Sequence, residues 1–419
     1  MAGMSPVRQD VTVVGRRLEP EDHRLRDFLT RVDQAYAWVE AGTPEAAALL
    51  AEHGLADADL PLVVAPDGVV SAATVERVAD AWHESDPPQL AHYDLAIVGA
   101  GPAGLAAAVY AASDGLSTLL VERDVPGGQA SHTSKIENFF GFPGGIEGAH
   151  LARLAGRQAE GFGAELVLLR GVTGSRMTPE GAQLEVAGGY EVSADVVIAA
   201  PGMDWRTLDV DGIEAGLGRG IYYGAGRSEA ARCGGDPVVV VGAGNSAGQA
   251  VMNLADAGAR VTMVVRGSSL AKSMSAYLVE RIHAHPLIEV RLRTEVEAVD
   301  CAGDLRSVTA GGEELPARAL FLCLGGLPRT GWASAAGVRL DAAGFVLTGP
   351  DLLERGERPA DWPLPRDPLA LETSIPGVFA AGDVRHGSVK RVAGAVGEGS
   401  MAVAFAHHRL EELRSGSGD

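Results

Sequence analysis

Three apolar segments close to residue 100 predict a strand, a helix and a second strand. Leu95–Val98 is a short apolar run of the kind that forms a buried parallel strand. Leu105–Ser113 is small and apolar, as expected of a helix that packs closely on a sheet. Leu119–Val121 is the next apolar run, and Glu122 follows it directly. The pattern is typical of one strand–helix–strand unit of an α/β domain.

The turn between the first strand and the helix reads GAGPAG, residues 99–104. Glycine suits this turn because the backbone must bend sharply and approach a pyrophosphate with no Cβ in the way. The helix N-terminus offers free N–H groups to the phosphates. Glu122 lies about 20 residues further on, where a carboxylate can bind an adenosine ribose. The alternative is a membrane span over the uncharged stretch Leu95–Ala112, which its glycines and proline disfavour.

A second unit with the same pattern begins at Pro237. Val238–Val241 predicts a strand, Gln249–Ala257 a helix and Val261–Val265 the next strand. The turn, residues 242–247, reads GAGNSA. The chain is therefore expected to hold two dinucleotide-binding units.

Residues 1–88 form a separate block without a glycine-rich turn. Its predicted elements are the strand Val11–Val14, the helix Glu19–Arg31, the strand Ala35–Val39, the helix Pro44–His53 with Thr43 as N-cap, the strands Leu60–Ala65 and Gly68–Val70, and the helix Thr74–His83. This order resembles the thioredoxin or glutaredoxin fold, and Leu60-Pro61 falls where that fold has its cis-proline. No cysteine follows the first strand. The block is interpreted as a docking or dimerisation module without dithiol chemistry.

Length, charge and cysteine content indicate a multidomain protein that binds neither nucleic acid nor an anionic membrane. The 419 residues suit two or three domains, and 46% hydrophobic residues suffice for their cores. A net charge of −20 argues against nucleic acid or an anionic membrane as partner. The first ten residues lack the apolar segment of a signal peptide. The three cysteines, Cys233, Cys301 and Cys323, form no CxxC and suit a reducing cytosol, so a cytoplasmic protein is expected. No spacing suggests a metal site.

Three further motifs carry a family resemblance: PGGQ at 126–129, ENFFGFPGGIEG at 137–148 and RQAEGFGAE at 157–165. In this order they resemble the low-molecular-weight thioredoxin reductases of the pyridine nucleotide-disulfide oxidoreductase superfamily, roughly over residues 91–413. The resemblance implies an α/β fold with two Rossmann-like domains, preceded by the thioredoxin-like block. The expected boundaries are 1–88 for that block, 91–203 and 319–419 for a discontinuous FAD-binding domain, and 204–318 for an NAD(P)H-binding domain.

The resemblance also implies FAD in the first unit and NADPH in the second. The position equivalent to Glu122 holds Arg266, and Lys272 follows. A cation there favours a 2′-phosphate, whereas an acid would repel it. Family members usually carry His-Arg-Arg here, but this chain has Val-Arg-Gly at 265–267, so NADH remains the alternative. An ordinary solvated face is the other interpretation of Arg266 and Lys272.

The C-terminal part is expected to complete the FAD site. Residues 319–324 are predicted to return the chain to the FAD domain, and a strand ending at Asp383 precedes the long helix Val392–Leu413. The expected FAD contacts are Gly99, Gly101, Pro102, Ala103, Gly104, Glu122, Arg123, Gly128, Gln129, Asn138, Val172, Gly202, Gly382, Asp383, Arg391 and Val392. The expected NADPH contacts are Gly242, Gly244, Asn245, Ser246, Ala247, Arg266 and Lys272.

The catalytic dithiol of the family has no counterpart in the sequence. Thioredoxin reductases place a CxxC before the second dinucleotide strand, where this chain reads GAGR at 224–227. Cys233 lies nearby and is a candidate thiol, with a small buried hydrophobe as the alternative. Tyr222 and Tyr223 could cover the flavin or only pack within a loop. His132 and His386 are candidate proton donors, with solvated loop histidines as the alternative.

Two dinucleotides imply hydride transfer from nicotinamide C4 to flavin N5. The family resemblance adds a rotating nicotinamide domain and a homodimer. The acceptor is expected to be a small molecule, disulfide, quinone or oxygen. A redox protein, as in ferredoxin–NADP reductases, and a flavoprotein sensor or scaffold without turnover are the alternatives.

Overall fold

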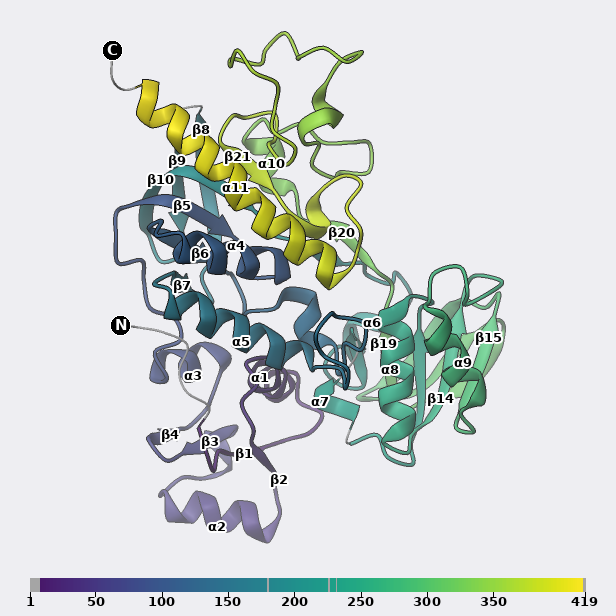
Figure 1. The fold of residues 1–419 in the computed structure, drawn as a ribbon. Helices are drawn as coiled ribbons and strands as arrows, with labels where there is room; N and C mark the ends of the chain where they lie inside the picture. The colour runs from purple at the N-terminus through teal and green to yellow at the C-terminus, as the bar shows by residue number, and fades with distance from the viewer. Residues whose placement is uncertain (1–7, 179–180, 225–226, 231, 417–419) are drawn as a thin grey trace.

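The computed structural model describes residues 8–178, 181–224, 227–230 and 232–416. These residues fold into an N-terminal block and two larger α/β domains, and Figure 1 shows the N-terminal block below both. Within the described residues, no helix combines the length and the apolar character that a bilayer span requires.

The N-terminal block has a four-stranded sheet in the order β2-β1-β3-β4, with β1 parallel to β2 and antiparallel to β3. Its helices and strands are β1 Thr12–Gly15, α1 Pro20–Arg31, β2 Ala37–Glu40, α2 Pro44–Glu52, β3 Leu62–Ala65, β4 Gly68–Val70 and α3 Val75–Ala81. The predicted order of elements is confirmed. Thr43 caps α2, because its side chain accepts from the Ala46 N–H at 3.2 Å, and the Leu60-Pro61 peptide bond is cis.

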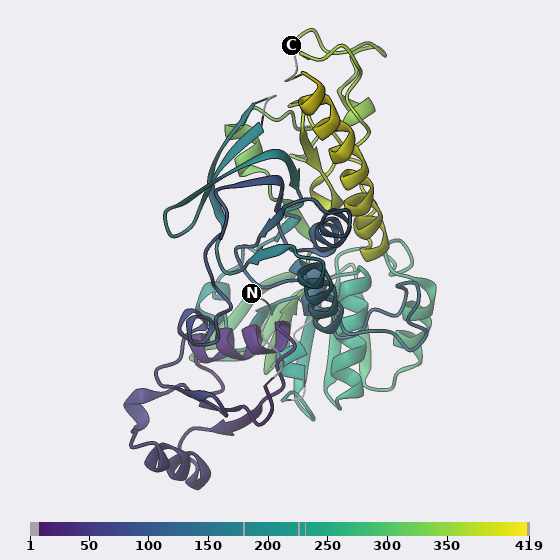
Figure 2. The same cartoon turned by 60° about the vertical axis from the view of Figure 1, so that its left-hand side comes forward.

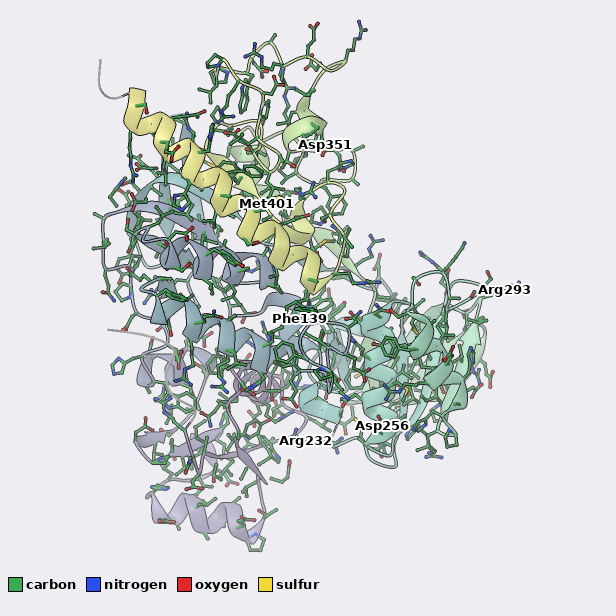
Figure 3. The ribbon with its side chains drawn as sticks, in the orientation of Figure 1. Phe139, Arg232, Asp256, Arg293, Asp351 and Met401 are labelled. Carbon is green, nitrogen blue, oxygen red and sulfur yellow. The ribbon has the colours of Figure 1, made fainter. Side chains whose placement is uncertain are left out.

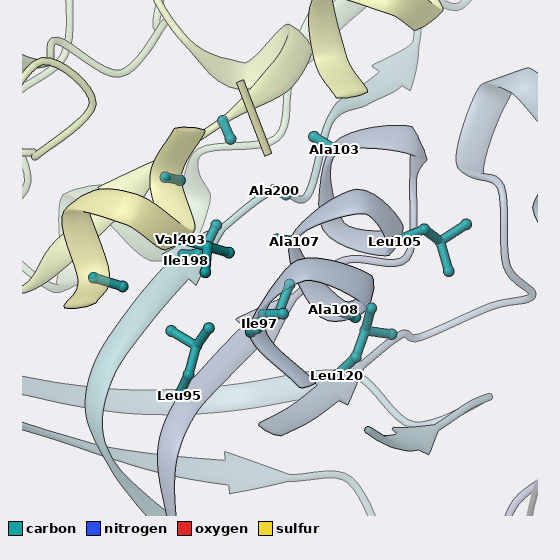
Figure 4. Close-up of a cluster of buried hydrophobic side chains, with 14 of the residues drawn as sticks. Leu95, Ile97, Ala103, Leu105, Ala107, Ala108, Leu120, Ile198, Ala200 and Val403 are labelled. Atoms are coloured by element: carbon teal, nitrogen blue, oxygen red, sulfur yellow. The ribbon is translucent and has the colours of Figure 1, made fainter. Parts of the chain in front are cut away.

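The first dinucleotide domain is built on the sheet β7-β6-β5-β10-β9-β8, with β21 paired to β10. Its strands are β5 His92–Val98, β6 Thr118–Val121, β7 Glu165–Val167, β8 Val172–Thr178, β9 Gly181–Val186, β10 Tyr190–Ala199 and β21 Val378–Ala380; its longer helices are α4 Pro102–Ser113, α5 Gly148–Gly161 and α11 Val392–Gly416. Figure 4 shows the core, where Ile97, Ala107 and Ile198 are fully buried. A Cβ at Gly399 would collide with the carbonyl of Ala103, so α11 approaches α4 closely through small residues.

The second dinucleotide domain is built on the parallel sheet β12-β19-β13-β14-β15. Its elements are β12 Ile221–Tyr223, α7 Arg227–Ala230, β13 Pro237–Val241, α8 Asn245–Asp256, β14 Arg260–Val265, α9 Ala276–Ala284, β15 Ile288–Leu292 and β19 Ala319–Leu322, with an antiparallel sheet of β16 Val296–Ala302, β17 Asp304–Ala310 and β18 Glu313–Pro316. The helix α8 begins at residue 245, four residues before the predicted start, because Gly244 is its extended N-cap.

One predicted boundary is wrong. The sequence indicated a return to the first domain at residue 319, but β19 pairs with β12 and β13 inside the second sheet. A short, wholly apolar strand has the same pattern in either parallel sheet, so periodicity cannot assign it. The chain returns at β20 Gly326–Pro328, which pairs with β11 Met203–Trp205. These two short strands form the link between the domains.

Candidate active site

A single cavity of about 1070 Å³ is lined by both glycine-rich turns. It lies at the carboxyl ends of β5 and β13, where ligands bind in open α/β sheets. The predicted residues that line it are Gly101, Pro102, Ala103, Glu122, Arg123, Gly128, Gln129, Asn138, Gly202, Gly382, Asp383, Arg391, Val392, Gly242, Gly244, Asn245, Ser246, Arg266 and His132. The structure therefore brings most of the two expected dinucleotide sites into one space.

The first turn leaves room for a phosphate in front of α4. Gly99 has φ +104°, and a Cβ there would collide with the Ala200 carbonyl oxygen. A Cβ on Gly101 would instead meet nothing within 4 Å. The open space lies at the N-terminus of a twelve-residue helix, where backbone N–H groups lack intrahelical partners. This cradle fits the pyrophosphate of FAD.

Glu122 closes the first turn from the end of β6. Its Oε2 accepts from the Ala100 N–H at 2.7 Å, and its Oε1 accepts from the Asp124 N–H at 3.0 Å. Burial raises the pKa of Glu122, although the two backbone hydrogen bonds oppose that shift. Since backbone groups orient the carboxylate at the cavity wall, it is placed to bind a ribose.

The second turn repeats this arrangement in front of α8. A Cβ on Gly244 would also meet nothing within 4 Å. The Asn245 side-chain oxygen accepts from the Ser275 N–H at 2.8 Å, which ties the turn to the next loop. The Arg266 side chain is 83% exposed, and its nearest carboxylate, Glu295, is 4.0 Å away. The guanidinium is therefore available to a 2′-phosphate.

Comparison with known proteins identifies the family. Residues 93–399 match the family model described as pyridine nucleotide-disulphide oxidoreductase. This chain belongs to that family. It is 31% identical to thioredoxin reductase from Bacillus subtilis over 331 residues, which is 77% of this chain and 96% of the relative.

Two solved structures extend the likeness to the fold. The Lactococcus lactis thioredoxin reductase in its FR conformation has a TM-score of 0.67 at 29% identity and covers 76% of this chain and 99% of its own. The crystal structure of T. acidophilum thioredoxin reductase has a TM-score of 0.66 at 27% identity, and the match covers 76% of this chain and 99% of that one. The predicted fold of two Rossmann-like domains is confirmed, and so are FAD and NADPH as the family's cofactors.

The C-terminal wall of the site is formed by Gly382, Asp383, Lys390, Arg391, Val392 and Ala395. The Gly382 N–H donates to Glu398 Oε2 at 2.7 Å, and Arg385 pairs with Glu398 Oε1 at 2.7 Å. Burial raises the pKa of Asp383, which faces the cavity. Sequence reasoning missed Glu398, because a glutamate inside a long helix gives no local signal.

A second cluster, of which the sequence predicts only Arg123, lies beside the strands that link the two domains. Asp204 Oδ1 pairs with Arg123 Nη2 and with Arg329 Nη2, each at 2.7 Å. Burial alone would raise the pKa of Asp204, but the two guanidinium groups outweigh it and lower that pKa. All three residues line the cavity. They are far apart in sequence, so no spacing rule connects them.

Several predicted cofactor contacts do not line the cavity. Gly99, Gly104, Val172, Ala247 and Lys272 are absent from its wall. A Cβ at Gly104 would collide with the Gly99 carbonyl, so that glycine serves helix–strand packing. For Lys272 the solvated-face interpretation holds better, since its side chain is exposed.

Three of the candidate catalytic residues, Tyr222, Tyr223 and His386, make contacts that do not suggest catalysis. Tyr222 is buried and stacks between Phe321, at 5.4 Å, and His23, at 4.6 Å, so it packs rather than covers a cofactor. The Tyr223 hydroxyl accepts from the Leu208 N–H at 3.4 Å. His386 pairs with Asp341 at 2.6 Å outside the cavity.

His132 is the candidate that does line the cavity. Its ring meets Trp205 edge-on at 5.6 Å between centroids. Burial, with the nearby Arg31 charge, lowers the pKa of His132 to about 4. The imidazole is therefore neutral at physiological pH and can donate one hydrogen bond but cannot act as a charged acid.

None of the three cysteines is disulfide-bonded. Burial raises the pKa of Cys233 to about 12 and that of Cys323 to about 12. Cys233 belongs to the core of the second domain and does not line the cavity. Cys323 contributes to the wall, but its thiol donates to the Gly224 carbonyl at 3.4 Å. Of the segment equivalent to the dithiol, Ala225 and Gly226 lie outside the described residues.

Proposed function

We propose that this chain is an FAD-dependent NAD(P)H oxidoreductase. It passes the electrons from the flavin to its acceptor without using a dithiol in its own sequence. When bound, FAD supplies two-electron chemistry, taking hydride from the nicotinamide and returning the electrons to an acceptor. The observation that carries the proposal is that both dinucleotide turns open into one cavity. The acceptor classes are a small molecule, a disulfide, a quinone or oxygen.

The residues of the chain have binding and orienting roles in this reaction. The turns at Gly101 and Gly244 receive the two pyrophosphates, and Glu122 binds the FAD ribose. Arg266 selects NADPH through its exposed guanidinium. His132 and Trp205 exclude water beside the place where the dinucleotides meet.

Cysteine chemistry supports a non-dithiol acceptor. A thiol whose pKa is near 12 is almost wholly protonated at pH 7, and the thiolate is the reactive form. The remaining cysteine, Cys301, also has a raised pKa because of burial. The three cysteines, at positions 233, 301 and 323, are too far apart in sequence for any two of them to form a CxxC motif.

A homodimer is also part of the proposal. The helices α4, α5 and α11 lie side by side in the first domain (Figures 1 and 2). Each exposes a large apolar side chain: Tyr110 at 50%, Leu154 at 42% and Met401 at 43%. Such a face suits a self-complementary contact. Light scattering on the purified protein tests it.

The deciding experiment is an anaerobic titration of the flavin-loaded protein with NADPH and then with NADH. We expect the absorbance of the oxidised flavin to bleach with about one equivalent of NADPH. Quinones, low-molecular-weight disulfides, oxygen and a ferredoxin are then added singly to find which restores the absorbance. Absence of bleaching with both nucleotides would refute the oxidoreductase proposal, and recovery only with ferredoxin would favour the protein-acceptor alternative.

A further inference from the structure

Helix α1 of the N-terminal block contacts both dinucleotide domains. Figures 1 and 2 show it between its own sheet and the rest of the molecule. His23 and Arg26, in the first half and the middle of α1, face the second domain, whereas Arg31, its last residue, faces the first. The two sets of contacts lie on a single rigid element of twelve residues.

The contact with the second domain is a buried ion pair. Arg26 is 0% exposed and Glu229 is 2% exposed, and Arg26 Nη2 lies 3.1 Å from Glu229 Oε1. His23 Nδ1 lies 3.1 Å from the same oxygen. Burial would raise the pKa of Glu229, but His23 and Arg26 outweigh it and lower that pKa to about 2. The carboxylate is therefore charged, desolvated and dependent on α1.

Other contacts surround this ion pair. Arg17 Nη2 donates to the Arg232 carbonyl at 3.0 Å. The Arg26 and Arg232 guanidinium groups make cation–π contacts with the Trp38 ring, at 4.6 Å and 5.2 Å from its centroid. Figure 3 labels Arg232 at the junction of the N-terminal block and the second domain. One arginine of the N-terminal block and one of the second domain thus stack on the same tryptophan.

The contact with the first domain is at the C-terminal end of α1. Arg31 Nη1 lies 2.9 Å from Asp124 Oδ2, and Arg31 Nε donates to the Ser131 hydroxyl at 3.0 Å. Just beyond the helix, Asp33 Oδ2 pairs with Arg153 Nε at 2.7 Å. Val125 is part of the hydrophobic core of the N-terminal block. This end is therefore fixed by charge and by apolar packing.

The direct connections between the two dinucleotide domains are more exposed than the contacts of α1: Arg123 and Asp204, which pair at 2.7 Å, have side chains that are 53% and 49% exposed. The chain crossings between the domains are the short strands β11 and β20. An exposed pair, Arg281 with Glu137 at 3.0 Å, adds little, because exposed ion pairs are worth about 0–1 kcal/mol. If the second domain rotated while the N-terminal block stayed in place, Arg26 would separate from Glu229 and a buried charge would be left without its partner. If the N-terminal block moved with the second domain, the contacts of Arg31 and Asp33 with the first domain would break instead.

We propose that the N-terminal block is a clamp in which α1, through Arg26–Glu229 on one side and Arg31–Asp124 on the other, holds the two dinucleotide domains in one orientation. The proposal rests on the proposed function, since it specifies how the two bound dinucleotides meet. Hydride transfer then occurs in the fixed arrangement in which both turns share a cavity. The expected rotation of the nicotinamide domain would not occur in this chain.

The test measures domain orientation directly. Spin labels are attached at Asp351→Cys and Asp256→Cys, two exposed positions in the first and second domains that Figure 3 labels. The labelled full-length holoprotein is diluted with unlabelled protein, so that distances within one chain dominate. Pulsed electron paramagnetic resonance then gives the distance distribution with and without NADPH. The clamp predicts one narrow distribution that NADPH leaves unchanged.

Variants on α1 and its partners supply the contrast. Glu229→Ala is expected to add a second distance population and a second, slower phase of flavin reduction. Asp33→Ala, at the other contact, is a milder variant with the same expected direction if Glu229→Ala does not fold. The matched control is Glu21→Ala, since Glu21 lies on the same helix, is 59% exposed and pairs with Arg24 of its own block.

Two results would overturn the clamp: a wild-type distribution that shifts or splits with NADPH, or folded Glu229→Ala and Asp33→Ala proteins whose distributions match that of the control. Retained flavin absorbance shows that a variant is folded. Failure of the proposed function gives a different result, which is absence of flavin bleaching by either nucleotide, whatever the distances show.

Discussion

The neutral state of His132 makes a quantitative prediction about pH. The folded protein lowers the pKa of this imidazole from 6.5 to about 4 through burial and the Arg31 charge. The unfolded chain therefore binds a proton at higher pH than the folded chain does. Stability from the neutral imidazole is complete above pH 6.5 and is lost as the pH falls toward 4.

The magnitude follows from the size of the shift. A tenfold change in a proton-binding constant corresponds to 1.36 kcal/mol, so the fall of this pKa from 6.5 to about 4 corresponds to about 3.4 kcal/mol. At pH 5 the loss is about 2 kcal/mol relative to pH 7.5. For a domain of 150–250 residues this shifts the melting temperature by roughly 4–8 °C.

The assay compares wild-type protein with His132→Gln, in which the side chain keeps hydrogen-bonding capacity but does not titrate. Melting of the holoprotein is followed at a fixed scan rate at pH 7.5 and pH 5. Wild type should lose several degrees more than the variant between these pH values. His408→Gln, an exposed histidine on α11, is the control and should behave like wild type. Parallel losses in wild type and His132→Gln would refute the assignment of a neutral imidazole.

Three further variants test the cofactor sites and the thiol. Gly101→Leu should abolish retention of FAD, measured as flavin absorbance per chain after gel filtration, because the side chain would fill the pyrophosphate space; Gly144→Ala, also in open space, should retain it. Arg266→Ala should weaken NADPH binding about tenfold, equivalent to about 1.4 kcal/mol, and leave NADH binding unchanged. The control Arg260→Ala, at the other end of β14, should alter the binding of neither nucleotide. Equal losses of NADPH and NADH binding in Arg266→Ala would contradict a 2′-phosphate contact. Cys233→Ser should leave the NADPH-dependent bleaching of the flavin intact. A Cys233→Ser protein that retains flavin but is not bleached would mean that the buried thiol takes part in electron transfer.

Local sequence patterns were sufficient for the two turns and the elements beside them. Gly101 and Gly244 stand at helix starts, and the surrounding strand–turn–helix order needs no distant partner to form. The assignment of residues 319–322 failed, because its four buried apolar residues suit either sheet and only pairing with β13 decides. A prediction that rests on hydrophobicity alone cannot distinguish two parallel sheets in one chain.

Contacts between domains were beyond the reach of sequence reasoning. Asp204 meets Arg329 across 125 positions, and Arg26 meets Glu229 across 203. Each of these residues, taken alone, resembles an ordinary surface charge. Its position near the missing dithiol makes Tyr222 a candidate from sequence, but the structure buries it against His23 of the N-terminal block. A role for that block therefore became apparent only when its docking surface was known.

The clamp and the absence of a dithiol are physically consistent with each other. A domain that carries electrons to a distant partner on its own thiols must move, but hydride transfer between two dinucleotides in one cavity requires only that they stay aligned. Breaking a buried ion pair costs about 3–5 kcal/mol. If rotation must break Arg26–Glu229, that cost alone keeps the rotated state below about 1% of molecules. A buried ion pair contributes little net stability compared with apolar packing, so its presence between domains is better explained by the fixed orientation that it specifies.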